Sequence, residues 1–398
     1  MHASKVGRAS RARAAIRSRT LVTVPLLINP RAEATLDDAA PSRAPLPFHR
    51  LPGYAPTPLR ELPALAARCG VARVWLKDES ARLGLPAFKI LGASWAAAQT
   101  LAARLGAPEL AQDFAALRAR LDGAPTLVAA TDGNHGRAVA RVAALLGLPA
   151  RIFLPAGAAP ARIAAIAGEG AIVEEVDGTY DDAVAHAAGV TRETGGLLLQ
   201  DSSLPGHERI SELVVEGYAT LFWEIEEQLR AIGEWPPDLL LVQVGVGALA
   251  QAAVVAMKRR ELRGAVRVVG VEPVDAACVA AAIEAGEIVT LPGRQHSLMA
   301  GLNCGTASTV SWPWVSRGLD GIVTVPDEGA VEAMRALAAE GVVAGETGAA
   351  GAAGLLELTR DDEQRAAAGL AATTRIVLLS TEGATDPANW ERIIGRAP

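Results

Sequence analysis

The chain has 398 residues, half of them hydrophobic, and carries 44 acidic against 38 basic side chains for a formal net charge of −6. The length predicts two or three domain-sized units, and the acidic balance without a long basic block argues against nucleic-acid binding. No apolar run reaches the length of a membrane span, and the three cysteines form no CxxC pair, so we expect neither a membrane helix nor a structural zinc site.

The first 43 residues are expected to form a disordered or extended arm. Residues 1–19 carry six basic side chains and no acid, and they lack the apolar core of a secretory signal. A transit peptide is the alternative to a disordered tail. Proline-rich residues 30–58 predict an extended connection to the body of the chain.

Short apolar runs alternate with alanine-rich helical segments from residue 71 onward. Strands are expected at 71–76, 126–130, 151–154, 171–176, 196–200, 238–243, 266–271, 321–325 and 375–380, with helices such as 93–105 and 208–232 between them. This order indicates βαβ units and a mostly parallel sheet. Roughly ten strands are too many for one ordinary sheet, so we expect two α/β domains with a ligand cleft between them. The expected division is a small domain of residues 93–208 and a large domain of 44–92 plus 209–398.

One lysine has an unusual setting. Only four basic residues are lysines, and Lys89 alone lies among apolar and small residues, at the head of the helix expected at 93–105. Burial in an apolar pocket lowers the pKa of a lysine and makes its amine a usable nucleophile. The alternative is an ordinary lysine whose aliphatic stem packs against the core.

Three loops follow expected strands and could carry chemistry. The first runs from Thr131 to Gly136 and presents an acid, an amide and an imidazole. The second, Gly245-Val246-Gly247-Ala248-Leu249, places glycines before a helix, where unpaired N–H groups can hold a phosphate. The third begins Ser380-Thr381 and offers hydroxyls to a heteroaromatic nitrogen. Each loop taken alone could also be an ordinary turn, and for the third loop a hydroxyl that caps the turn is the commoner case.

Together these features match the three anchors of pyridoxal 5′-phosphate, which are an aldehyde, a phosphate and a ring nitrogen. A nucleotide site ranks last, because neither a Walker sequence nor a full GxGxxG sequence is present.

The order of motifs resembles the fold-type II (tryptophan synthase β-like) enzymes that use pyridoxal phosphate. Within that family it is most similar to the ammonia-lyases that act on 2,3-diaminopropionate. The resemblance covers about residues 45–386 and rests on Tyr54-Ala55-Pro56-Thr57-Pro58-Leu59, Phe88-Lys89, Thr131-Asp132-Gly133-Asn134-His135-Gly136, Gly245-Val246-Gly247-Ala248, Gly345-Glu346-Thr347-Gly348 and Ser380-Thr381-Glu382-Gly383. It implies an α/β fold of two open, mostly parallel twisted sheets with the cofactor in the cleft between them.

The resemblance also implies how the cofactor is held. Lys89 is implied to bond the aldehyde carbon, and Asn134 to bind the phenolate oxygen. The phosphate is assigned to Gly245, Val246, Gly247, Ala248 and Leu249, and the ring nitrogen to Ser380 or Thr381. A hydroxyl partner leaves that nitrogen largely unprotonated, which favours elimination over transamination.

Catalysis is assigned to Lys89, Asp132 and Asp201. Related dehydratases usually carry a small or apolar residue at the place of Asp132, and a carboxylate there can take a proton or attract a second ammonium group. Which of Lys89 and Asp132 acts on which enantiomer is left open. Substrate binding is assigned to Thr131, His135, Tyr180 and Glu346, and no metal site is expected.

The resulting hypothesis is the conversion of 2,3-diaminopropionate to pyruvate and ammonia. A serine or threonine dehydratase or racemase of the same fold is the nearest alternative. A non-catalytic α/β ligand-binding protein is the second. The resemblance further implies a homodimer, and the composition fits a reducing cytosol. Whether Cys278 and Cys304 pair is left open.

Overall fold

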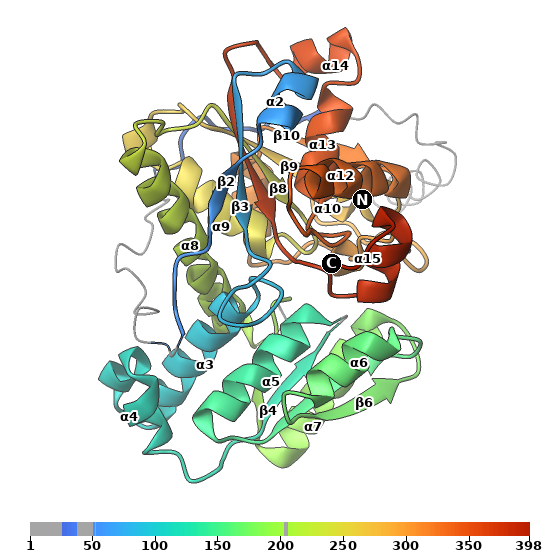
Figure 1. Cartoon of the computed structure of the whole chain (residues 1–398). Coiled ribbons are helices and arrows are strands. Elements are labelled where there is room, and N and C mark those ends of the chain that lie inside the picture. The colour runs from blue at the N-terminus through green and yellow to red at the C-terminus, as the bar shows by residue number, and fades with distance from the viewer. Residues whose placement is uncertain (1–25, 38–50, 52, 132, 203–205) are drawn as a thin grey trace, which may run out of the picture.

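The computed structural model describes residues 26–37, 51, 53–131, 133–202 and 206–398. It contains a seven-stranded sheet of order β1-β10-β9-β8-β11-β3-β2 and a four-stranded sheet of order β6-β5-β4-β7. All pairings are parallel except those of the two edge strands of the larger sheet. The predicted α/β class with two mostly parallel sheets is therefore confirmed (Figure 1).

The larger sheet has a parallel centre and two short antiparallel edges. Its central strands are β3 (Arg73–Asp78), β8 (Leu239–Gln243), β9 (Arg267–Pro273), β10 (Gly321–Val325) and β11 (Arg375–Ser380). The edges are β1 (Leu26–Ile28), on β10, and β2 (Leu59–Glu61), on β3. The segment expected to be an N-terminal arm thus contributes an edge strand.

The larger sheet is covered by helices on both faces, as the continuous apolar runs predict. Along β8, Leu240 and Val242 belong to one apolar core, while Leu239 and Leu241 belong to a second core on the opposite face. Helices α8 and α9 lie on one side of this sheet and α12 and α13 on the other (Figure 1). The helices on this sheet are α2 (Pro63–Cys69), α8 (Glu208–Ala231), α9 (Ala248–Met257), α10 (Cys278–Ala285), α11 (Trp312–Gly318), α12 (Asp327–Ala339), α13 (Ala350–Leu358), α14 (Asp362–Ala367) and α15 (Pro387–Ile394).

The smaller sheet consists of β4 (Leu127–Ala130), β5 (Ala150–Pro155), β6 (Ile172–Val176) and β7 (Leu197–Leu198), with α5 (Asn134–Leu146), α6 (Pro160–Ala167) and α7 (Tyr180–Thr194) packed around it. Thr179 caps α7 in a reciprocal capping box with Asp182, as its sequence predicts. Because α5 begins four residues after β4 ends, the helix starts directly at the carboxyl edge of this sheet.

Helix α3 (Ile90–Arg104) joins the two sheets and packs closely against α8; the short α4 (Phe114–Arg118) follows it. Glycines make the close approach possible. A Cβ atom at Gly217 would lie 2.5 Å from the carbonyl oxygen of Leu91, and one at Gly92 would lie 2.8 Å from the carbonyl oxygen of Val214. Lys89 is the residue immediately before α3, so this packing fixes the start of the helix beside it.

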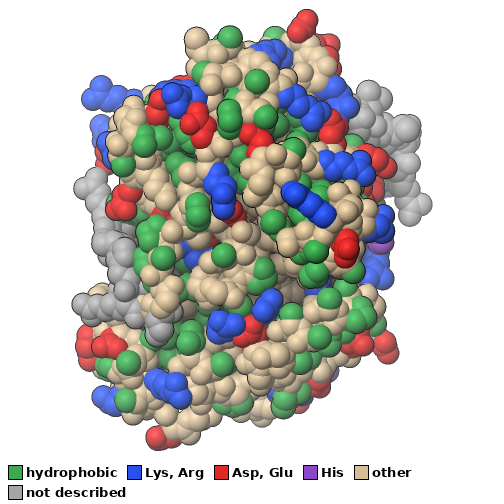
Figure 2. Space-filling model, in the orientation of Figure 1, with side chains coloured by type: hydrophobic (Ala, Val, Ile, Leu, Met, Phe, Trp, Pro, Cys, Tyr) green, Lys and Arg blue, Asp and Glu red, His purple; other side chains and the backbone are tan. Residues whose placement is uncertain are grey.

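Within the described residues, no helix combines the length and the apolar character needed to cross a bilayer. Figure 2 shows basic and acidic side chains interspersed over one face of the molecule.

Candidate active site

A pocket lies between the two sheets, at the carboxyl ends of β4, β8 and β11. Most of the predicted site residues line it: Lys89, Thr131, Asn134, His135, Tyr180, Asp201, Gly245, Val246, Gly247, Ala248, Leu249 and Thr381. Ser380 and Glu346 are buried but do not line it. Asp132 lies outside the described residues.

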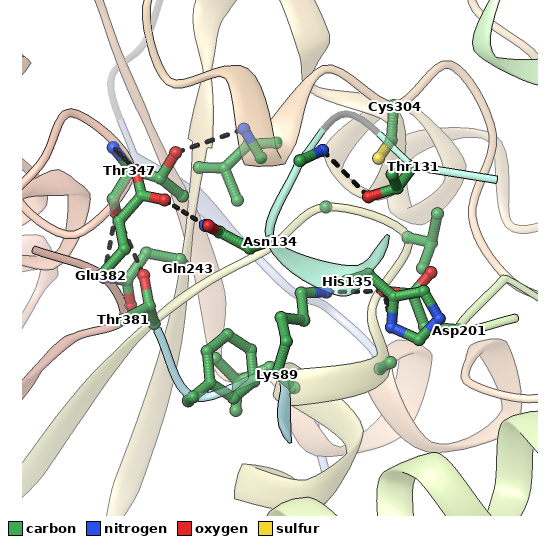
Figure 3. A pocket seen from close by; sticks show the side chains of 18 of the residues that line it. Lys89, Thr131, Asn134, His135, Asp201, Gln243, Cys304, Thr347, Thr381 and Glu382 are labelled. Carbon is green, nitrogen blue, oxygen red and sulfur yellow. Dashed lines mark hydrogen bonds and ion pairs between the residues drawn. The ribbon is translucent and has the colours of Figure 1, made fainter. Parts of the chain in front are cut away.

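Lys89 forms an ion pair with Asp201 inside the pocket, with 2.6 Å between Nζ and Oδ2. Figure 3 shows its side chain pointing at that carboxylate, next to the His135 ring. Burial alone lowers the pKa of Lys89, but the Asp201 carboxylate outweighs it and the pKa lies above its ordinary value. The expectation of a lowered lysine pKa is therefore wrong, because the sequence did not show that a carboxylate faces the amine.

The geometry determines the tautomer of His135. Its Nε2 lies 2.8 Å from the carbonyl oxygen of Leu199, which can only accept, so Nε2 carries the hydrogen. Burial lowers the pKa of His135, and the ring is neutral near pH 7. Its buried Nδ1 is then an acceptor with no hydrogen-bond partner among the described residues, 3.9 Å from Oδ2 of Asp201. A ligand ammonium group can fill that place.

Tyr180 is fixed at the pocket wall by the side-chain amide of Gln200. Gln200 donates from Nε2 to the Tyr180 hydroxyl over 2.7 Å, while its Oε1 accepts from the backbone N–H of Ala130 over 3.1 Å. Tyr180 is thereby tied to the end of β4.

The glycine loop after β8 is shaped to hold a compact anion. A Cβ at Gly245 would lie 3.2 Å from Cys304 Sγ, and Gly247 has φ +104° at the position just before α9. The first N–H groups of a helix have no partner within the helix and carry a partial positive charge. Ser311, whose Cβ lies 3.2 Å from the place of a Gly247 Cβ, adds a buried hydroxyl without a partner among the described residues. These donors suit a phosphate group.

The two hydroxyls at the end of β11 are not equivalent. Thr381 lines the pocket and donates to the carbonyl oxygen of Thr347 over 3.4 Å. Ser380 is fully buried and donates to the carbonyl oxygen of Glu382 over 3.3 Å. Of the two candidates for a ring-nitrogen partner, Thr381 is the one exposed to the pocket.

Glu382 is a site residue that sequence reasoning did not assign. It lines the pocket, accepts a hydrogen bond from the Asn134 side-chain amide, and accepts a second from the backbone N–H of Thr347 over 3.2 Å. Burial raises its pKa. Its position in a Ser-Thr-Glu-Gly sequence after an apolar strand was the only available signal. Arg162 and Gln243 also line the pocket without having been assigned.

Glu346, which was assigned to substrate binding, is buried near Glu382. Its carboxylate accepts a hydrogen bond from the Asn389 side chain on α15 and does not line the pocket. Cys278 and Cys304 do not form a disulfide, and the Cys278 sulfur lies 3.6 Å from the carbonyl oxygen of Gly245. No group of three or more His, Cys, Asp or Glu side chains in the described ranges is arranged to hold a metal ion.

Comparison with known proteins decides the family. Residues 50–382 match the family model described as pyridoxal-phosphate dependent enzyme. The chain belongs to this family. It is 36% identical over 366 residues to the diaminopropionate ammonia-lyase of Salmonella typhimurium, with 88% of this chain and 90% of the relative covered.

Solved structures agree with this assignment. The holo diaminopropionate ammonia lyase from Escherichia coli superimposes with a TM-score of 0.86 at 31% identity, with 93% of this chain and 96% of the other covered. The same enzyme in complex with an aminoacrylate–pyridoxal phosphate azomethine reaction intermediate gives a TM-score of 0.84 at 30% identity and the same coverage. The predicted resemblance and the predicted cofactor are confirmed.

The pocket fits that cofactor. It offers one amine, on Lys89, that can bond an aldehyde, and a hydroxyl, on Thr381, at the end of a third strand. It also offers the start of α9 at Ala248, where the first N–H groups have no partner within the helix. These groups come from distant parts of the chain and line a single pocket.

Proposed function

We propose that the chain converts 2,3-diaminopropionate and water to pyruvate and two molecules of ammonia. The observation that carries this proposal is the Lys89–Asp201 ion pair facing the same pocket as the glycine loop before α9. The names of the relatives support the choice of substrate.

In this proposal Lys89 would bond the aldehyde carbon of the cofactor, the backbone N–H groups at the start of α9 would bind its phosphate, and Thr381 would be the partner of its ring nitrogen. Bound pyridoxal phosphate supplies an electron-withdrawing ring that makes the α-proton of an amino acid acidic. Asp201, 2.6 Å from Nζ, orients the Lys89 amine and stabilises its ammonium form, so the proton must leave to water before the amine can react.

The substrate is held by groups that face the pocket from the smaller sheet. The lone pair on His135 Nδ1 accepts a hydrogen from a substrate ammonium group. The Lys89 amine would take the α-proton on its own face of the substrate. For the opposite face we retain the sequence-based assignment of Asp132 as the base.

A diamino acid fits the charge of this pocket better than a hydroxy acid. Two described carboxylates line it, those of Asp201 and Glu382. A carboxylate attracts the second ammonium group of a diamino acid more strongly than the neutral hydroxyl group of a hydroxy acid. A serine or threonine dehydratase remains the alternative activity.

Steady-state turnover on D- and L-diaminopropionate and on D- and L-serine separates these activities. We expect much faster pyruvate formation from diaminopropionate, with two ammonia molecules released per pyruvate. Faster pyruvate release from serine would refute the proposed substrate.

Two substitutions of Lys89 test the site itself. Lys89→Ala and Lys89→Arg should both abolish turnover and the near-ultraviolet to visible absorbance band of the bound cofactor. Lys89→Arg serves as the matched control for folding, because it keeps a positive charge opposite Asp201 yet has no reactive amine. An unchanged band in both variants would contradict the role of Lys89.

We propose further that the enzyme is a homodimer, as the resemblance implies, and that it works in the cytoplasm, as its composition suggests. Each chain would have a large domain of residues 44–92 plus 209–398 and a small domain of 93–208. Light scattering should give twice the chain mass of 41.1 kDa. Limited proteolysis should cut between the two domains.

A further inference from the structure

A hydrogen bond between the two halves of the pocket has no role in the proposal above. Asn134 is the first residue of α5, on the smaller sheet, and Glu382 follows β11 of the larger sheet. The Asn134 Nδ2 atom donates to Oε2 of Glu382 across the pocket wall, and Figure 3 shows the two side chains meeting there, away from Lys89 and Asp201.

Glu382 has almost no freedom to move. The residue is 3% exposed, and its carbonyl oxygen accepts from the N–H of Gly345 over 3.0 Å. A Cβ at Gly348 would lie 2.2 Å from that carbonyl oxygen, and Ala87 forms a β-bridge with Glu382 on the side that leads to Lys89. Because Thr347 N–H binds Oε1, the carboxylate offers its remaining oxygen, Oε2, in a fixed direction.

Asn134 needs such an acceptor. Its amide carries two hydrogens and turns easily about its last side-chain torsion, and the residue is only partly buried at the pocket wall. With one hydrogen bound to Glu382, the plane of the amide is fixed. The second hydrogen and the oxygen are then held in defined directions.

We propose that Glu382 is a positioning residue that orients the Asn134 amide toward the cofactor and thereby also joins the two sheets at the pocket. The inference rests on the proposed role of Asn134 in cofactor binding. Glu382 itself need not touch the cofactor. Burial raises the pKa of Glu382, while the charge of Arg162 and the hydrogen bonds from Asn134 and Thr347 oppose that rise.

A double-mutant cycle tests this coupling through the dissociation constant of pyridoxal phosphate. The variants are Glu382→Gln, Asn134→Ala and their combination. Glutamine keeps the shape of Glu382 but has one acceptor oxygen, which Thr347 N–H occupies, so Asn134 loses its acceptor. We expect each single variant to bind about tenfold more weakly, a loss of about 1.4 kcal/mol. The double variant should be no weaker than Asn134→Ala.

The matched control is Glu346→Gln. It removes a neighbouring buried carboxylate that does not line the pocket, and cofactor binding should change less than twofold. The near-ultraviolet circular dichroism of the bound cofactor should weaken in Glu382→Gln and remain in Glu346→Gln. Thermal unfolding of the cofactor-free proteins checks that each variant folds. A second cycle uses Glu382→Met, whose side chain has no oxygen to accept the Asn134 hydrogen.

Additive losses in the cycle would overturn the inference, since they would mean that Glu382 acts on the ligand independently of Asn134. Wild-type binding by Glu382→Gln and Glu382→Met would overturn it as well. Neither outcome would affect the proposed function, because the wild type could still convert diaminopropionate. Failure of the wild type to bind pyridoxal phosphate would instead reject the site and this inference together.

Discussion

At the scale of single residues, the pocket is organised by charges that neutralise one another. Lys89 and Asp201 face each other at 2.6 Å, and the proximity of Lys89 holds the pKa of Asp201 well below its ordinary value although burial alone would raise it. Neither side chain could remain charged in this place alone. The reactive amine is therefore stored as an ammonium group in the cofactor-free protein.

Asp201→Asn should change how the cofactor-free enzyme captures pyridoxal phosphate as the pH is varied. Only a neutral amine attacks an aldehyde, so the capture rate rises with pH until Lys89 is deprotonated. Without the carboxylate, burial dominates and the pKa of Lys89 falls. The rise in stopped-flow capture rate should therefore level off at a lower pH in Asp201→Asn than in the wild type. Coincident pH profiles would show that Asp201 does not control the amine.

The setting of a lysine in the sequence is an incomplete guide to its burial. Lys89 stands out in the sequence because its neighbours are apolar, whereas Lys77 lies in a polar Lys-Asp-Glu-Ser run. In the structure Lys77 is fully buried and pairs with Glu224 on α8 at 2.7 Å. Lys258 is buried too and pairs with Asp320. Each partner is distant in the sequence, so no local pattern could reveal it.

At the scale of elements, periodicity predicted the central strands well and the edges poorly. The strands at 321–325 and 375–380 have the expected bounds, and the helix expected at 208–232 ends one residue earlier. Strands β1 and β2 were missed, because each has three residues and its place depends on pairing with a partner far along the chain. The three loops at strand ends were found because glycine and polar residues interrupt long apolar runs there.

The contact between α3 and α8 gives a prediction for Gly217→Ala. The added methyl group would lie 2.5 Å from the carbonyl oxygen of Leu91, so the helices must separate and the start of α3 at Lys89 must move. We expect a loss of about 1–3 kcal/mol in the free energy of unfolding, together with weaker cofactor binding. Denaturant titration of the cofactor-free protein measures the first effect, and a cofactor titration measures the second.

Gly189→Ala is the matched control for that substitution. Gly189 lies within α7, and a Cβ there meets one side-chain atom at 4.0 Å. Alanine should stabilise this helix by about 0.5–1 kcal/mol. Equal effects of the two substitutions would show that close packing of α3 on α8 is not required.

Helix α8 also carries a buried charge cluster whose removal is expected to be costly. Glu224 binds Lys77 and Arg82, each at 2.7 Å, and Arg82 binds Glu79 at the same distance. Glu224→Gln leaves two buried cations facing one anion, so the free energy of unfolding should fall by about 3–5 kcal/mol. Glu212→Gln, which removes an exposed pair on the same helix, should change it by less than about 1 kcal/mol. Similar values for both variants would contradict a structural role for the cluster.

At the scale of the whole molecule, the pocket exists because two sheets present the carboxyl ends of their strands to each other. Thr131 and His135 come from the smaller sheet, while Gly247 and Thr381 come from the larger one. Parallel strands put such loops at one edge regardless of their distance in the sequence. The sequence could therefore predict which loops meet, but not the side-chain contacts across the cleft, such as that between Asn134 and Glu382.

Because both sheets contribute to one pocket, the cofactor should stabilise them together. At a free concentration of about 100 times its dissociation constant, pyridoxal phosphate should add about 2.7 kcal/mol to the free energy of unfolding. Hydrogen exchange should slow at the start of α5 and at Gly245–Gly247 alike. Pyridoxal without phosphate is the control, and at the same concentration it should stabilise far less because it leaves the start of α9 without an anion. Slower exchange confined to one sheet, or equal stabilisation by the two compounds, would contradict a cofactor that spans the cleft with its phosphate at the glycine loop.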